Sequence, residues 1–104
     1  MLRSDSPRPN QAAWYIVTVI TVERVQTGVR MERRMLKVLK GLAEYLDISL
    51  GDLLEGVVLH AFEGKAPFDE STLLVVNRLR EVYGLDLTAA DSHHLTSSEE
   101  EGEA

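Results

Sequence analysis

The chain has 104 residues, no cysteine and a net charge of −6. This length suits one small domain with a modest core, and association with a second copy is a common way to bury more surface. The lack of cysteine excludes disulfides, thiol catalysis and cysteine-based zinc sites, and it fits the cytoplasm, where we expect the protein. The longest apolar run, residues 14–22, is shorter than the ~20 residues of a membrane-spanning helix, so no membrane partner is expected.

The charge is distributed very unevenly along the chain. Residues 24–40 hold six basic residues and one acid, a net of +5, whereas residues 41–104 hold three basic residues and fourteen acids, a net of −11. Such an asymmetry indicates an interaction surface for a charged partner more than it indicates a fold.

The N-terminal part is predicted to pass from a disordered tail into a strand. Residues 1–13 are polar and hold two of the three prolines, which is typical of disorder. Residues 14–22 are β-branched and aromatic, so they form a possible extra strand, and the strand signal continues over about 22–31. From Val25 the residues alternate, with Val25, Thr27, Val29 and Met31 on one face and Gln26, Gly28 and Arg30 on the other. Period two predicts one buried and one exposed face.

The period then changes to that of helices. Apolar residues recur at three and four positions, which predicts an amphipathic helix over about 33–46. After a short turn, Ser49 is a strong N-cap, with Asp52 three residues on, and it opens a second helix over about 50–63 that Gly64 ends. Residues 14–64 are therefore interpreted as one domain.

The C-terminal part is predicted to be a helical extension followed by a tail. Within residues 65–88, Asp69 or Ser71 can cap a third helix that runs to about Tyr83, with Gly84 as its stop. Residues 89–104 end in SSEEEGEA and are predicted to be an acidic disordered tail.

An isolated strand leaves its hydrogen-bonding groups open, so the strand predicted over 22–31 needs a partner. The economical partner is the same strand of a second copy. The expected fold class is therefore mainly α with one short strand: a ribbon-helix-helix in which an intertwined homodimer shares a two-stranded antiparallel ribbon, plus an additional C-terminal helix. The outer face of such a ribbon would carry Gln26, Gly28 and Arg30, and a two-stranded ribbon fits the major groove of DNA.

The order of these elements resembles the ribbon-helix-helix family of bacterial and phage repressors and antitoxins. The resemblance covers about residues 24–63 and is carried by QTGVR, by LKVLKGLAEYL and by the junction DISLGDLLEGVVL. It implies that Gln26, Gly28 and Arg30 read bases. It also implies that backbone N–H groups of Ser49, Leu50 and Gly51 hold a DNA phosphate, a task that suits a helix N-terminus.

Three further arginines are expected to contact phosphates, namely Arg24, Arg33 and Arg34. The last two open the first predicted helix, where positive charge opposes the helix dipole, and that unfavourable position favours a role outside the helix itself. Asp91, His93 and His94 are interpreted as incidental, and no metal or other cofactor is expected.

The predicted function is a dimeric, sequence-specific DNA-binding transcriptional regulator, most simply a repressor. An antitoxin whose residues 65–104 bind a toxin protein is the alternative, and a dimerisation module that binds protein only is another. The chain has no phosphate loop, nucleophile elbow, HExxH motif or plausible triad, so we do not expect an enzyme. The roles of residues 14–22 and of the acidic tail, which could compete with DNA, stay open.

Overall fold

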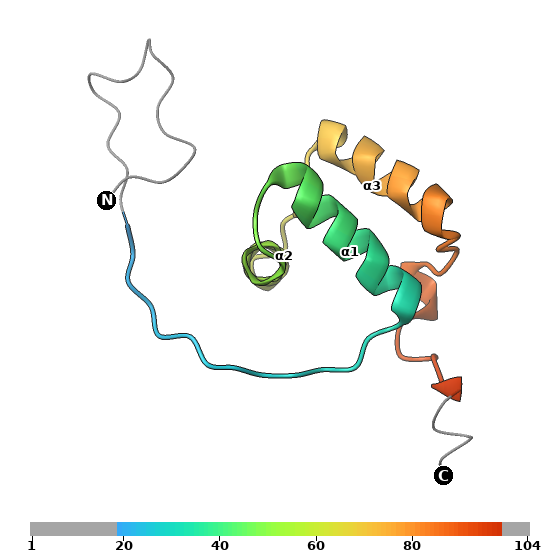
Figure 1. The fold of residues 1–104 in the computed structure, drawn as a ribbon, viewed down its shortest axis with the longest axis horizontal. Helices are drawn as coiled ribbons and strands as arrows, with labels where there is room; N and C mark the ends of the chain where they lie inside the picture. The colour runs from blue at the N-terminus through green and yellow to red at the C-terminus, as the bar shows by residue number, and fades with distance from the viewer. Residues whose placement is uncertain (1–18, 99–104) are drawn as a thin grey trace.

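The computed structural model describes residues 19–98, which form three α-helices and a short 3₁₀ turn. The helices are α1 (Arg33–Leu46), α2 (Leu50–Phe62) and α3 (Glu70–Tyr83), and the 3₁₀ turn is η2 (Ala89–Asp91). Figure 1 shows α3 alongside α1, α2 crossing α1 steeply, and an extended segment that leads past α2 into the start of α1. The helices predicted over 33–46 and 50–63 are present within one residue of those bounds.

Local side chains define the helix ends. Ser49 accepts a hydrogen bond from the Asp52 N–H at 3.0 Å, and Asp69 accepts one from the Thr72 N–H at 2.8 Å, so both act as N-caps. Glu32 caps α1 in the same way, through the Met35 N–H at 2.8 Å. Helix α3 ends at Gly84, whose φ of 67° lies in the left-handed region that glycine adopts without strain.

The predicted β-ribbon is absent, and this part of the prediction was wrong. Residues 19–31 are extended but belong to no strand, and residues 19–98 contain no sheet. The physical reason is that a strand exists only with a partner to complete its hydrogen-bond ladder, and no second extended segment pairs with this one among the described residues. The mainly α class is consistent with the structure. Of the possible extra strand over 14–22, residues 14–18 lie outside the described residues, as does the tail at 1–13.

The hydrophobic core sits where α1 meets the other two helices. Leu42 is 1% exposed and forms a buried cluster with Ala43 and Leu53. Partly buried apolar residues of all three helices and of the α2–α3 connection surround it: Leu39, Leu46, Val57, Phe68, Val75, Val76 and Leu79. Helix α3 therefore shares the core with α1 and α2. A Cβ added at Gly41 would lie 3.0 Å from a methyl group of Leu79, so α1 and α3 approach closely at this point.

The chain continues in an ordered form after α3. Leu85 is buried, and η2 follows within the range predicted to be disordered. The Thr88 N–H donates to the Asp91 carboxylate at 2.8 Å, while the Asp91 N–H donates to the Thr88 carbonyl at 2.9 Å. These reciprocal bonds close the turn, which Figure 1 shows beside the start of α1.

Candidate nucleic-acid interface

The exposed face of α1 carries a line of basic side chains. Arg33, Lys37 and Lys40 are four and three residues apart, so they lie one above another on the helix. The buried residues Val38 and Leu42 lie on the other side of α1. We call Arg33, Lys37 and Lys40 the basic stripe. Its positive charges point away from the core, where a polyanion can approach them.

Lys37 also has an internal neighbour. Its Nζ lies 5.7 Å from the centre of the Tyr83 ring at the end of α3, which is a cation–π distance. This contact leaves Lys37 exposed and restrains its side chain within the basic stripe.

The residues predicted to read bases lie on the extended segment. Gln26, Gly28 and Arg30 are all exposed, and a Cβ built at Gly28 would meet no atom within 4 Å. The alternation predicted that Val25 and Val29 would be buried behind them, but these valines are 78% and 77% exposed. Both faces of the segment are therefore open in the single chain.

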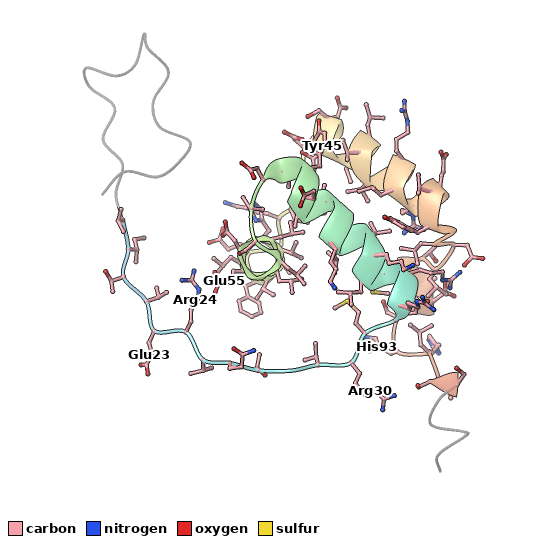
Figure 2. All side chains as sticks on the ribbon, in the orientation of Figure 1. Glu23, Arg24, Arg30, Tyr45, Glu55 and His93 are labelled. Atoms are coloured by element: carbon pink, nitrogen blue, oxygen red, sulfur yellow. The ribbon has the colours of Figure 1, made fainter. Side chains whose placement is uncertain are left out.

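Arg24 is held by α2. Its Nε and Nη2 donate to the two carboxylate oxygens of Glu55, each at 2.8 Å. Figure 2 shows the two side chains pointing toward each other from the extended segment and α2. This bidentate pair raises the pKa of Arg24 and lowers the pKa of Glu55, in both cases chiefly through the hydrogen bonds. Both groups face solvent, so the pair adds little stability, and DNA would have to compete with Glu55 for the guanidinium.

Arg34 makes tertiary contacts that the sequence did not reveal. Its Nε donates to Glu32 at 2.9 Å, and its Nη1 donates to the Gly84 carbonyl at 2.9 Å and to Asp86 at 3.2 Å. The hydrogen bond to Glu32 is the main reason that the pKa of Arg34 is raised. Arg34 thus ties the start of α1 to the end of α3, whereas Arg33 of the same turn stays exposed.

Glu32 compensates for the positive charge at the start of α1. The first turn of α1 contains no acid, so Arg33 and Arg34 oppose the helix dipole there. Partial burial raises the pKa of Glu32, but hydrogen bonds from the Met35 N–H and from Arg34 outweigh it, and the pKa is lowered. The carboxylate therefore stays ionised at the helix N-terminus.

The predicted phosphate anchor is the first turn of α2. Leu50 and Gly51 open the helix after Ser49, and Gly51 is exposed with nothing within 4 Å of a Cβ built on it. The Ser49 hydroxyl is occupied by the cap to Asp52, so a phosphate here would rely on backbone N–H groups. The role predicted for these residues stays a prediction.

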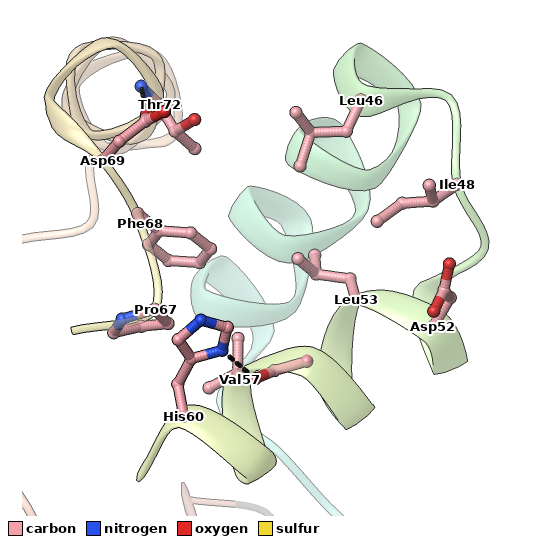
Figure 3. A pocket seen from close by; sticks show the side chains of 11 residues that line it. Leu46, Ile48, Asp52, Leu53, Val57, His60, Pro67, Phe68, Asp69 and Thr72 are labelled. Atoms are coloured by element: carbon pink, nitrogen blue, oxygen red, sulfur yellow. Dashed lines mark hydrogen bonds between the residues drawn. The ribbon is translucent and has the colours of Figure 1, made fainter. Parts of the chain in front are cut away.

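A shallow pocket lies between α2 and the start of α3 (Figure 3). Its wall includes Leu53, Val57 and Phe68, and His60 stands at its edge. The His60 Nδ1 lies 2.7 Å from the Gly56 carbonyl, which can only accept, so this nitrogen carries the proton. The surface suits an apolar group, and within residues 19–98 no cluster of three His, Asp or Glu side chains could hold a metal ion.

Sequence reasoning missed one neighbour of the predicted site. Ser97 Oγ lies 3.4 Å from Arg30 Nη2, so the chain after α3 reaches the segment that is predicted to read bases. Figure 2 shows His93 and Arg30 at this same end of the molecule. The Thr88-x-x-Asp91 spacing was the available signal of an ordered turn here, although it does not reveal where the turn packs.

Comparison with family models, with curated proteins and with solved structures finds no match to this chain. The resemblance to the ribbon-helix-helix family therefore stays a prediction made from its residues. Among residues 19–98, no helix has the length and apolar character needed to cross a membrane.

Proposed function

We propose that this protein is a DNA-binding regulator of transcription that acts as a homodimer in the cytoplasm, with repression as its simplest mode. One observation carries the proposal: the basic stripe, Arg33, Lys37 and Lys40, is exposed on the side of α1 away from the core and follows directly on the exposed segment with Gln26 and Arg30. Cations neutralise phosphates, and Gln and Arg are side chains that recognise base edges.

The charge balance of the chain explains why DNA binding would depend on the basic stripe. A protein with a net charge of −6 is repelled by DNA as a whole, so binding must come from a local positive surface. The six basic residues of 24–40 supply one. Arg24 and Arg34 are paired with carboxylates. The contacts that we assign to DNA are the basic stripe on α1 and Arg30 on the exposed segment.

Exposed apolar side chains support the homodimer. Val25 and Val29 precede α1, while Leu59 and Phe62 on α2 are 63% and 80% exposed. A symmetric dimer that covers these four side chains on each copy buries eight in all, which would contribute roughly 12–24 kcal/mol at about 1.5–3 kcal/mol each. The cost of association, about 4–15 kcal/mol, is smaller. A second copy that covers these residues can therefore be stable, and no β-ribbon is needed for this estimate.

Selection of bound fragments from the source genome tests the function, with wild type and Arg30→Ala run side by side. We expect wild type to enrich a set of related sites and Arg30→Ala to lose that enrichment. A folded wild type that retains no DNA even at low salt would rule out the proposed function.

Analytical ultracentrifugation tests the homodimer. Phe62→Glu places a charge on the exposed face of α2 and is expected to give a monomer, whereas Tyr45→Glu, at another exposed aromatic on α1, should leave the dimer intact. A monomeric wild type at micromolar concentration would contradict the assembly.

An antitoxin is the second candidate, favoured by two exposed apolar residues on the outer side of α3, Leu74 and Val82. They offer a contact that a toxin could cover. Co-expression with each neighbouring gene tests this: a harmful product neutralised by wild type but not by Leu74→Glu would support it. If every neighbouring product is harmless, this candidate is excluded.

A further inference from the structure

The chain after α3 is anchored beside the start of α1, close to the proposed DNA-binding residues. Leu85 is 8% exposed, and its N–H donates to the Arg80 carbonyl at 2.8 Å. Arg80 in turn donates to the Leu87 carbonyl at 2.7 Å, and Thr88 and Asp91 close η2. One apolar anchor and a series of hydrogen bonds thus hold residues 85–91. We call residues 84–97 the C-terminal segment.

This segment contacts two of the arginines in residues 24–40. Arg34 bonds the Gly84 carbonyl and the Asp86 carboxylate, and Arg30 lies 3.4 Å from Ser97 Oγ. The C-terminal segment contains two acids, Asp86 and Asp91, and no lysine or arginine. It therefore presents oxygen acceptors and negative charge to guanidinium groups, which is also what DNA would present.

We propose that the C-terminal segment is an autoinhibitory clamp, which docks on Arg34, covers Arg30 at one end of the DNA-binding surface, and must be displaced by DNA in order for DNA to bind. The inference rests on the proposed function. Because the clamp and DNA exclude each other, the apparent affinity for DNA is the intrinsic affinity reduced by the fraction of molecules in which the clamp is open. Any change that weakens docking of the segment therefore tightens DNA binding.

Two variants weaken the clamp by different means. Leu85→Ala removes the buried anchor without changing the charge, and Asp86→Asn removes the carboxylate beside Arg34. Leu74→Ala is the control for the first, because it truncates an exposed leucine of α3. Glu70→Gln is the control for the second, since it removes one negative charge at the other end of α3, about 20 Å from Gly84 at 1.5 Å per helical residue.

The experiment combines DNA affinity with hydrogen exchange on the full-length chain. Anisotropy of a short fluorescent duplex at low salt gives the affinity, and amide exchange over 85–97 with and without the duplex reports docking of the segment. We expect both clamp variants to bind about three- to tenfold more tightly and both controls to match wild type. We also expect the duplex to accelerate exchange in the segment of the wild type.

The outcomes separate the clamp from the function on which it rests. Equal affinities for all variants, with exchange over 85–97 unchanged or slowed by DNA, would overturn the clamp and leave the DNA-binding function intact. No binding by any folded variant would overturn both. If circular dichroism shows that Leu85→Ala does not fold, the effect of the duplex on exchange in wild type decides the question.

Discussion

Replacing Lys37 and Lys40 by glutamine tests whether the exposed face of α1 contacts DNA phosphates. Each phosphate contact on duplex DNA contributes about −0.9 to the slope of log K against log salt. The double variant should therefore have a slope smaller in magnitude by about 1.8. At 0.1 M salt, one decade below the 1 M reference, each contact is worth about eightfold, so the variant should bind about sixtyfold more weakly.

The assay is a salt titration of duplex binding by fluorescence anisotropy. The matched control is Lys65→Gln with Arg78→Gln, two exposed cations outside α1. Both double variants lower the net charge from −6 to −8, so they repel DNA equally at long range. The same loss of affinity and the same change of slope in both variants would show that only the total charge matters and would refute a contact at α1. A thermal melt checks that loss of the Lys37–Tyr83 contact leaves the fold intact.

Three predictions concern the fold. Leu42→Ala, at the most buried side chain, should lower the free energy of unfolding by about 2–5 kcal/mol in a denaturant titration, whereas Leu74→Ala, at an exposed leucine, should change it by less than about 0.5 kcal/mol. Gly56→Ala should stabilise the protein by about 0.5–1 kcal/mol, because a Cβ at this position of α2 meets nothing within 4 Å. Gly41→Ala should raise the free energy of unfolding by less, because its Cβ would press on Leu79. Equal gains in stability would contradict the close approach of α1 and α3. Hydrogen bonds, chiefly from the Thr72 N–H, lower the pKa of Asp69 in the folded state. Its stabilising effect is therefore complete above the ordinary carboxylate pKa of about 4 and lost as the pH falls through the lowered value. Melting temperatures from pH 7 to pH 2 should fall below about pH 4, less steeply for Asp69→Asn, and identical profiles would contradict this role.

Helices were predictable because their signals are local. Ser49, Asp69 and Gly84 each act within one helical turn, through a cap or a left-handed φ, and no distant residue is needed for that effect. The apolar period of α1 likewise marks the face that becomes the core. Capping and periodicity together therefore predicted the approximate bounds of the three helices, although they did not identify the Glu32 cap of α1.

Pairings between distant residues were not predictable in the same way. Arg24 and Arg34 look alike in the sequence, as exposed bases near a strand-to-helix transition, yet Arg24 bonds Glu55 and Arg34 bonds Gly84 and Asp86. These partners lie 31 to 52 positions away in the sequence, and only the packing of α2 and α3 on α1 brings them close. The sequence showed that positive charge gathers in residues 24–40, but it could not show which of these cations would be paired with carboxylates.

The extended segment carries a pattern that the packing of the single chain does not explain. Alternating valines favour a buried apolar face, yet Val25 and Val29 are 78% and 77% exposed, and Leu59 and Phe62 on α2 are likewise open. Within residues 19–98 the hydrophobic core is already formed by other side chains, so nothing there remains to cover these four. An apolar surface from another molecule would account for all of them at once. Whether the alternating valines are buried therefore depends on the oligomeric state. If the protein is a monomer, the valine pattern has no physical explanation.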